Sequence, residues 1–398
     1  MNKILANCIS LGIGLGAIGV AFQAQAASFQ GLGDLPGGSF ESSAYGVSAN
    51  GSVVIGYSKI ANGEEAFRWT QATGMVGLGD LLGGSFSSAA YGVSADGSVV
   101  VGQSYSANGS EAFRWTQATG MVVLGYLPGG GLVSNGAIGV SANGSVVVGL
   151  AISANGVEAF RWTQATGMVG LGDLPGGSFY SIAYGVSGDG SVVVGLGNGP
   201  GANGQEAFRW TQATGMVGLG DLAGGSFYSL ARGVSADGSV VVGYGNSANN
   251  SGANRTEAFR WTQVTGMVGL GDLPGGNFDS AAWGVSADGS VLVGYGNSAN
   301  GQEAFIWNST QGIRSLKEIL TNDYGLNLTG WTLSYANAIS ADGLTVVGWG
   351  TNPSGNREAW IASLDGQTDP PNPTVPEPSS ILGLGLFSLV VFLRKKRS

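Results

Sequence analysis

Five near-identical segments of the chain carry side chains that could do chemistry at a fixed spacing. Residues 158–177 read EAFRWTQATGMVGLGDLPGG, and similar segments begin at residues 65, 111, 206 and 257. Each contains a Glu, an Arg three residues later and, in most copies, an Asp near its end. Two carboxylates in different environments can hydrolyse a glycosidic bond. Near-identical repeats provide near-identical environments, so the pattern favours structural roles over catalysis.

The acidic and basic members of these segments form two series. The glutamates are Glu65, Glu111, Glu158, Glu206, Glu257, Glu303 and Glu358. The arginines are Arg68, Arg114, Arg161, Arg209 and Arg260. An odd separation places two residues on opposite faces of a strand, so each Glu could meet an Arg of a neighbouring repeat. We predict a ring of structural salt bridges, and a catalytic carboxylate pair is the alternative.

Aspartates and tryptophans recur as well. The aspartates of the Leu-Gly-Asp-Leu motif are Asp34, Asp80, Asp173, Asp221 and Asp272. We predict turn residues here, with repeated calcium sites as the alternative, although each calcium ion needs about six to eight oxygen ligands. The tryptophans are Trp69, Trp115, Trp162, Trp210, Trp261 and Trp307. Their fixed register inside a strand predicts core packing rather than stacking on sugars.

The composition excludes several common kinds of active site. The chain has no histidine, and its single cysteine is Cys8, close to the N-terminus. The usual catalytic triads and zinc ligand sets are therefore absent. The net charge of −9 opposes binding to phosphate groups. We predict no catalytic residue, no metal, no cofactor and no nucleic-acid partner.

The repeats predict a circular array of four-stranded sheets. The turn Ser-(Ala/Gly)-(Asp/Asn)-Gly ends at Gly51, Gly97, Gly144, Gly190, Gly238, Gly289 and Gly343. Intervals of 46 to 54 residues are typical of propeller blades. Each repeat has four strand-like segments, and the turn between the first two predicts a two-residue hairpin with positive φ at both positions. We predict an all-β fold, a seven-bladed β-propeller of four-stranded blades over residues 28–365.

The order of the strands within each sheet follows from residue size. The first strand contains an Ala in every copy: Ala44, Ala90, Ala137, Ala183, Ala231, Ala282 and Ala336. Because small side chains suit the crowded axis, we predict that this strand is innermost. Residues 28–35 match a fourth strand and residues 358–361 a third strand. We predict that residues 31–35 pair with residues 358–363 and close the ring, which removes two exposed edges.

The segments Ala-Phe-Arg-Trp, Gly-Val-Ser-x-Asp-Gly and Val-Val-Val-Gly resemble the HAF-repeat family of extracellular proteins. The resemblance covers residues 28–363. The His-Ala-Phe that defines the family is here Glu-Ala-Phe, or Glu-Ala-Trp in the last copy. The resemblance implies an extracellular repeat protein and no particular reaction.

The position after the inner-strand Ala differs strongly between the repeats. Its residues are Tyr45, Tyr91, Ile138, Tyr184, Arg232, Trp283 and Asn337. On an innermost strand, these side chains would line one mouth of a central channel. Aromatic and hydrogen-bonding groups suit a carbohydrate or peptide, so we predict a binding rim, with simple packing variation as the alternative.

Both ends of the chain resemble sorting signals. Residues 1–26 have a basic start, an apolar run and an Ala-x-Ala end, which are typical of a secretory signal peptide. Residues 366–375 form a Pro-rich linker, and residues 376–398 resemble the PEP-CTERM sorting signal with its short transmembrane-like segment. The residues that carry this resemblance are Pro376, Glu377, Pro378, Arg394, Lys395, Lys396 and Arg397. It implies export, transient membrane association and processing by an exosortase-type protease.

These observations favour an exported protein of the cell surface or extracellular matrix. The leading hypothesis is a non-catalytic propeller that is structural or that binds exopolysaccharide, another surface glycan or an envelope component. The alternative is a secreted polysaccharide lyase or hydrolase. A polar cluster that breaks the repeat pattern would favour an enzyme, and residues 315–331 are the place to look for one.

Overall fold

A computed structural model describes residues 27–131, 135–199, 204–248 and 254–365. These residues belong to one compact unit that ends at Gly366. The predicted signal peptide, Pro-rich linker and sorting signal lie outside the described residues.

The described residues contain twenty-eight strands and one short helical segment. The first strands of the repeats are β2 (Ser42–Val47), β6 (Gly83–Val93), β10 (Gly136–Val140), β14 (Ser181–Val186), β18 (Gly224–Val234), β22 (Gly275–Val285) and β26 (Thr332–Ile339). The second strands are β3 (Val53–Ile60), β7 (Val99–Ser106), β11 (Val146–Ser153), β15 (Val192–Asn198), β19 (Val240–Ala248), β23 (Val291–Ser298) and β27 (Thr345–Thr351).

The third strands are β4 (Gly63–Thr70), β8 (Gly109–Thr116), β12 (Gly156–Thr163), β16 (Gln205–Thr211), β20 (Asn254–Thr262), β24 (Gly301–Asn308) and β28 (Arg357–Ser363). The fourth strands are β5 (Gly74–Gly77), β9 (Gly120–Val123), β13 (Gly167–Gly170), β17 (Gly215–Gly218), β21 (Gly266–Gly269), β25 (Gly312–Ser315) and β1 (Ser28–Gly31). The helical segment consists of α1 (Leu316–Glu318) and the π-helix η1 (Ile319–Asp323).

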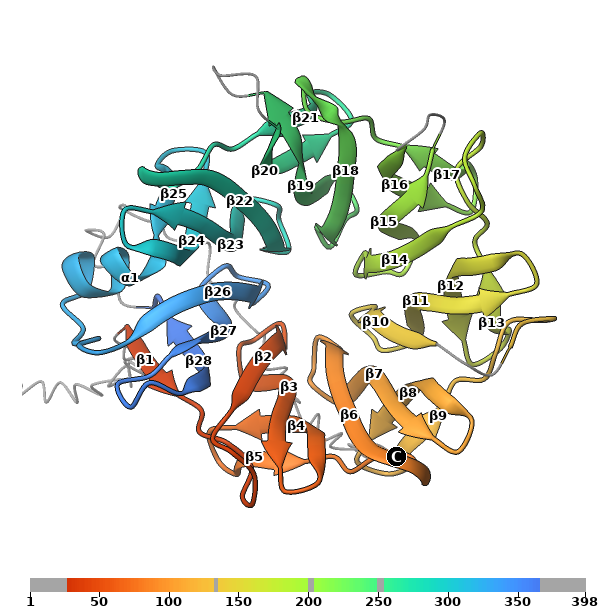
Figure 1. Cartoon of the computed structure of the whole chain (residues 1–398), viewed down its shortest axis with the longest axis horizontal. Helices are drawn as coiled ribbons and strands as arrows, with labels where there is room; N and C mark the ends of the chain where they lie inside the picture. The colour runs from red at the N-terminus through yellow and green to blue at the C-terminus, as the bar shows by residue number, and fades with distance from the viewer. Residues whose placement is uncertain (1–26, 132–134, 200–203, 249–253, 366–398) are drawn as a thin grey trace, which may run out of the picture. The chain divides into compact units, whose positions relative to one another are not determined.

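The strands form five four-stranded sheets and one eight-stranded sheet. The eight-stranded sheet contains two meanders, β2–β5 and β6–β9, which share one parallel pair between Glu64 and Ser87. The predicted all-β fold is therefore confirmed. Seven separate sheets were expected, but the parallel pair joins two of them, so the structure has six sheets. The first strand of each meander is innermost, as predicted (Figure 1).

A closed cycle of backbone hydrogen bonds surrounds the axis. It joins the turns that follow the inner strands, and each N–H donates to the carbonyl of the next turn. The donors in order are Ala49, Ala95, Ala142, Gly188, Ala236, Ala287 and Ala341, and the last donates to Ala49 again. The seven distances lie between 2.9 and 3.0 Å. The cycle ties each inner strand to both of its neighbours.

The turns in this cycle differ from the predicted two-residue hairpin. The N–H of Ser94 donates to the carbonyl of Val99, so four residues lie between the two paired positions. Gly97 has φ +72°, and no residue other than glycine has positive φ in the described part of the chain. The carboxylate of Asp96 accepts hydrogen bonds from the Ser94 and Ser98 hydroxyls and from the Ser98 N–H. These bonds hold the Asp in an ordinary backbone conformation, which is why the prediction for its φ was wrong.

The N-terminal strand completes the last sheet. β1 pairs antiparallel with β28, from Ser28 opposite Ser363 to Gly31 opposite Trp360. The predicted closure is thus confirmed, although the paired strand begins three residues earlier than expected. The Gly33 N–H donates to the Glu358 carboxylate at 2.9 Å, which repeats a contact found within the internal repeats.

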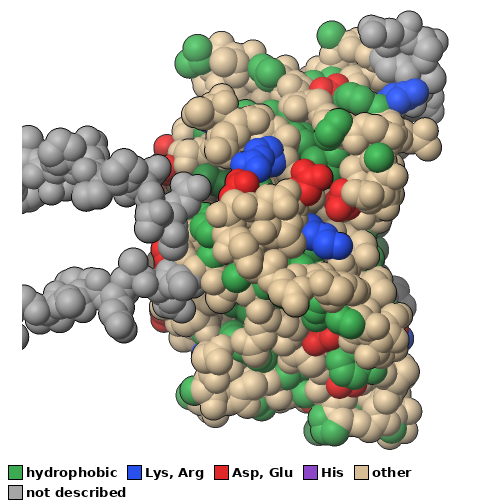
Figure 2. Space-filling model, turned by 90° about the vertical axis from the view of Figure 1, so that its left-hand side faces the viewer, with side chains coloured by type: hydrophobic (Ala, Val, Ile, Leu, Met, Phe, Trp, Pro, Cys, Tyr) green, Lys and Arg blue, Asp and Glu red, His purple; other side chains and the backbone are tan. Residues whose placement is uncertain are grey.

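The core lies between the faces of consecutive sheets. The aromatic residue of each third strand is completely buried: Phe67, Phe113, Phe160, Phe208, Phe259, Phe305 and Trp360. In one cluster, Val192 and Ala207 of one repeat pack against Val241 and Phe259 of the next. On the face shown in Figure 2, charged side chains form small isolated groups on a mainly uncharged surface, in keeping with a charged content of only 10%.

Candidate functional site

Each predicted rim residue occupies a β-bulge of its inner strand. In β2, Ala44 pairs with Gly56 and Gly46 pairs with Ile55, so Tyr45 has no partner on β3. The same register shift occurs at Tyr91, Ile138, Tyr184, Arg232, Trp283 and Asn337. A bulge takes one residue out of the ladder and redirects its side chain. This variable position of the repeat is therefore released from sheet pairing.

The glycine after the rim residue allows neighbouring inner strands to approach closely. A Cβ on Gly185 would lie 3.0 Å from the carbonyl oxygen of Arg232, and one on Gly233 would lie 3.2 Å from that of Trp283. Contacts this short require the neighbouring backbone to move. The predicted need for small residues at the axis is borne out at these positions.

All seven rim side chains line one cavity. Its volume is about 340 Å³, which lies in the range of small-molecule pockets. An adjoining cavity of about 230 Å³ shares Tyr45, Tyr91, Ile138, Trp283 and Asn337 and continues past the valines that precede the turns. We call the first cavity the channel mouth, and it lies at the end of the channel away from the turns. Sequence reasoning thus identified the residues that meet there, and their role in binding stays a prediction.

The channel mouth is bordered by a belt of stacked aromatic rings and guanidinium groups. Arg232 lies over Tyr184 at 4.3 Å and over Trp283 at 4.2 Å. Trp283 contacts Tyr335 edge-on at 6.4 Å, and Tyr335 stacks on Trp349 at 4.5 Å. These contacts connect the fourth repeat to the last.

The belt continues across the junction between the last and first repeats. Arg357 lies over Trp349 at 3.7 Å and over Tyr57 at 5.9 Å. Tyr57 contacts Tyr45 at 5.8 Å, and Tyr45 contacts Tyr91 at 5.6 Å. We call these rings and arginines, together with Tyr295, the aromatic belt. It gives the channel mouth a broad apolar border with polar edges.

Sequence reasoning missed the part of the belt that lies beyond the inner strands. Tyr57, Tyr295 and Trp349 share one position, directly after the glycine of the second strand. The other repeats carry Gln103, Leu150, Leu196 and Tyr244 there. Variation at this position was a usable signal. Tyr335 and Arg357 also occupy positions that vary between the repeats, so variation alone did not single them out.

The polar groups of the mouth are mainly donors. Burial raises the pKa of the Tyr45, Tyr91 and Tyr184 hydroxyls, so they stay neutral at physiological pH. Within the described residues, Arg232 makes no hydrogen bond or ion pair, and its Nε is buried without a partner. Asn337 has a structural contact, because its side-chain amide donates to the Ala44 carbonyl at 2.7 Å and links the last inner strand to the first.

The predicted ring of Glu–Arg salt bridges is wrong. The ion pairs found in the described part of the chain are Lys59–Glu64 and Arg314–Asp323. The repeated glutamates accept backbone hydrogen bonds instead, as Glu65 does from Gly79 at 2.9 Å. Four arginines donate to a glycine carbonyl of the next repeat: Arg68, Arg161, Arg209 and Arg260. Backbone amides and carbonyls therefore take the places that side-chain partners were expected to fill.

One aspartate of the predicted series and all six tryptophans have structural roles. The Asp272 carboxylate accepts hydrogen bonds from the N–H groups of Leu273, Asp279 and Asn297, as expected of a turn residue. Burial raises its pKa and that of Asp279. No group of three acidic, Cys or His side chains is placed to hold a metal within the described ranges. All six tryptophans of the predicted series contact hydrophobic clusters, which confirms core packing.

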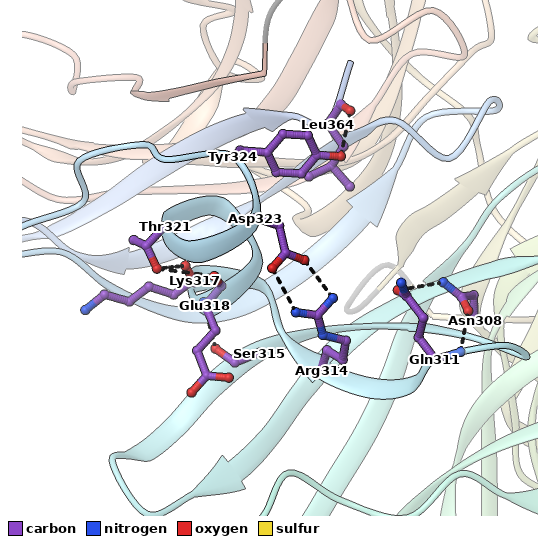
Figure 3. A network of polar contacts seen from close by, with 10 residues as sticks. All are labelled: Asn308, Gln311, Arg314, Ser315, Lys317, Glu318, Thr321, Asp323, Tyr324 and Leu364. Atoms are coloured by element: carbon purple, nitrogen blue, oxygen red, sulfur yellow. Dashed lines mark hydrogen bonds and ion pairs between the residues drawn. The ribbon is translucent and has the colours of Figure 1, made fainter. Parts of the chain in front are cut away.

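Residues 315–331 form a buttress beside the closing strand. Figure 3 shows Arg314 facing Asp323, which it binds at 2.7 Å, and Tyr324 donating to the Leu364 carbonyl at 3.0 Å. Trp331 packs edge-on against Phe29 of β1 at 5.0 Å. Leu316, Leu320 and Leu328 are buried in the adjoining cluster. The repeat pattern is broken here by a packed helical segment that is held by an ion pair and hydrogen bonds.

Pro376, Glu377, Pro378, Arg394, Lys395, Lys396 and Arg397 of the predicted sorting signal lie outside the described residues. Among the helices of the described part, none is long and apolar enough to cross a membrane.

No protein-family model matches the chain, and no curated protein matches it significantly. Solved structures do match. An oligogalacturonate lyase from Vibrio parahaemolyticus has a TM-score of 0.50 at 11% identity, with 85% of this chain and 97% of the lyase covered. The β-propeller domain of the Trilobed protease from Pyrococcus furiosus has a TM-score of 0.48 at 10% identity, with 89% and 100% covered.

TolB from Acinetobacter baumannii has a TM-score of 0.43 at 11% identity, and the match covers 82% of this chain and 64% of TolB. At such identities the likenesses concern the fold alone. The ring of radial antiparallel sheets has the architecture of a β-propeller.

Proposed function

We propose that this protein is an exported, non-catalytic β-propeller that binds a glycan of the cell surface or matrix at its channel mouth. One observation carries the proposal. The seven rim positions, which carry five different residue types, meet around a single cavity, whereas the aromatic residue that every third strand shares is buried in the core. Variation concentrated in one cavity is the pattern expected of a recognition site on a repeated frame.

The side chains of the mouth suit a sugar. Aromatic rings offer flat apolar faces, and tyrosine and tryptophan add hydrogen-bonding edges. Tyr45, Tyr91 and Tyr184 keep neutral hydroxyls that can donate or accept. Pockets for small ligands combine such surfaces with a few polar groups that fix orientation.

The proposed ring has seven blades. The eight-stranded sheet then counts as two blades, because a single parallel pair joins its two meanders. The cycle of seven hydrogen bonds supports this count.

The proposed location rests on the two ends of the chain. A signal peptide at residues 1–26 would direct export, and the sorting signal at residues 376–398 would bring the protein to an exosortase-type protease. Release from the transient membrane-associated form would leave the propeller on the cell surface or in the exopolysaccharide. The mass of the mature protein tests this step, since it should correspond to cleavage near Ala26 and near Pro376.

Binding is tested with a purified protein of residues 27–375 and exopolysaccharide from the producing cell. Saturable binding without cleavage is expected. Trp283→Ala should abolish most of it, because Trp283 contacts both Arg232 and Tyr335. Phe40→Ala is the matched control, because Phe40 is an exposed aromatic residue outside the mouth.

Two outcomes would contradict the proposal. Release of new reducing ends or unsaturated products would favour the lyase or hydrolase. Equal binding by the Trp283→Ala and Phe40→Ala variants would place the interaction elsewhere on the surface.

A further inference from the structure

We infer that the channel mouth recognises an acidic sugar, whose carboxylate binds the guanidinium of Arg232. This inference rests on the proposed function and specifies the class of glycan. The aromatic rings of the belt alone would accept any sugar with an apolar face. Arg232 is the group that distinguishes an acidic residue from a neutral one.

Arg232 is held in place by rings and not by an acid. It lies between Tyr184 of the fourth repeat and Trp283 of the sixth, at 4.3 and 4.2 Å from their centroids. Cation–π contacts hold the guanidinium and leave its N–H donors without acceptors. Because its side chain lines the cavity, the unpaired donors are available to a bound ligand.

Several other arginines of the chain are already paired, and Arg114 and Arg357, which each have a buried Nε without a partner, do not line the cavity. Arg209 and Arg260 donate to the carbonyls of Gly238 and Gly289, and Arg314 binds Asp323. Arg232 has no such acceptor among the described residues. A positive charge that is partly desolvated without a counter-ion is unfavourable, and an anionic ligand would remove this cost.

The chemistry of the neighbouring groups selects a carboxylate on a sugar. A guanidinium presents paired donors that match a carboxylate in bidentate geometry. The indole Nε1 of Trp283 is a second buried donor without a partner, and indole can only donate. The ligand must therefore supply acceptors, while Tyr184 and Trp283 supply faces for its ring. A uronic acid residue combines these features.

The negative net charge of the chain predicts how salt should affect the binding of an acidic sugar. At −9, the protein repels a polyanion at long range. Attraction must then come from local contacts at the mouth. Salt screens the long-range repulsion more than it screens a partly buried pair. We expect binding of an acidic oligosaccharide to persist or strengthen as salt rises, whereas adsorption to a basic patch would weaken.

The probes are an alginate hexasaccharide, the same oligomer after reduction of its carboxyl groups, and a dextran sulfate oligomer of similar length. Calorimetry with residues 27–375 measures their affinities. The acidic hexasaccharide should bind at least about tenfold more tightly than its reduced form, as expected for a charge-assisted hydrogen bond. Arg232→Gln should remove this preference. Arg260→Gln, in the same repeat, should keep it, and thermal unfolding should show both variants folded.

The outcomes separate this inference from the proposed function. Equal affinity of the wild-type protein for the acidic and reduced oligomers would refute carboxylate recognition and leave glycan binding in place. Dextran sulfate binding as tightly as the hexasaccharide would also refute it, because charge alone would then suffice. A carboxylate preference that survives in Arg232→Gln would refute the role of this residue. Absence of binding to any glycan, including the cell's own exopolysaccharide, would overturn the proposed function itself.

Discussion

In the fifth repeat, Phe259 on β20 and Arg232 on β18 lie in one sheet but in different surroundings. Phe259 is completely buried among residues of two repeats. Arg232 stands in a bulge, lines a cavity and lies between two aromatic rings. Every repeat keeps an aromatic residue at the first position, whereas the second position carries Tyr, Ile, Arg, Trp or Asn. The frame of the ring and its channel mouth are thus separable parts of the same sheets.

Removing the closing strand should break the frame most severely. A protein of residues 36–375 lacks β1, and with it the partner of β28 and the buried Leu32 and Leu35. We expect the melting temperature to fall by roughly 10 °C or more relative to residues 27–375. Differential scanning calorimetry measures the change. Unchanged melting would contradict the role of β1 in closure.

Phe259→Ala tests the frame at a single residue. Truncation of a buried Phe leaves a cavity and costs about 3–5 kcal/mol. Arg232→Ala in the same sheet should change the free energy of unfolding by less than about 1 kcal/mol, since its side chain makes no hydrogen bond within the described residues. Urea unfolding compares the two variants. Similar losses would show that the channel mouth is part of the frame.

Ser88→Ala tests the bonds that join consecutive repeats. The Ser88 hydroxyl accepts from the Ala66 N–H at 2.9 Å and donates to the Gly79 carbonyl at 2.6 Å. Its loss leaves two backbone groups without partners in a buried place, which costs about 1–3 kcal/mol. Ser98→Ala is the control, because Ser98 bonds to Asp96 on the exposed side of a turn. The control should lose less stability in the same urea titration.

The turn aspartates should make the frame sensitive to acid. Hydrogen bonds from Ser94 and Ser98 lower the pKa of Asp96 from 3.8 to about 2, and those from Ser187 and Ser191 do the same for Asp189. Because the folded pKa is below the unfolded one, this stabilisation is present above about pH 4 and disappears as pH falls towards 2.

Between pH 4 and pH 2, the melting temperature of the double variant Asp96→Asn and Asp189→Asn should fall less than that of the wild type. Near neutral pH it should unfold like the wild type, because Asn50 accepts the same set of bonds in the first repeat. An unaltered acid profile would show that these carboxylates do not set it.

Ile138→Tyr should have the smallest effect on the frame. Ile138 is the aliphatic member of the rim, and its bulge leaves it outside the sheet ladder. We expect a change in melting temperature of at most a few degrees, about 1 kcal/mol or less, together with a measurable change in glycan affinity. A loss of stability comparable to that of Ser88→Ala would contradict the separation of mouth and frame.

The fold was largely predictable because the same pattern of strands and turns recurs in each repeat. Seven copies of a turn, an Ala in every inner strand and an unmatched strand at each end were sufficient to predict the strand order and the closure. The rim was predictable for the same reason, since variation among near-identical copies marks positions that the frame does not constrain. The count of sheets was not, because the single bridge between Glu64 and Ser87 depends on local backbone geometry.

The partners of the polar side chains could not be predicted from residue types. Glu65 and Arg68 bind backbone groups. Every residue has the same backbone groups, so the residue types do not indicate these partners. The belt was hidden for a different reason. Trp349 meets Tyr335 and Arg357 from three different strands, and their meeting depends on the register between those strands. Variation among the copies marks the positions of these residues but not which of them meet.

The cycle of hydrogen bonds from Ala49 back to Ala49 has no first member. The place at which the chain begins and ends is therefore independent of the closure of the inner ring. A circular permutant, with residues 28 and 365 joined and new ends opened between the third and fourth strands of another repeat, would keep all seven links of the cycle. The chain ends could therefore be placed in any repeat of the ring, while the residues of the mouth kept their order around the channel.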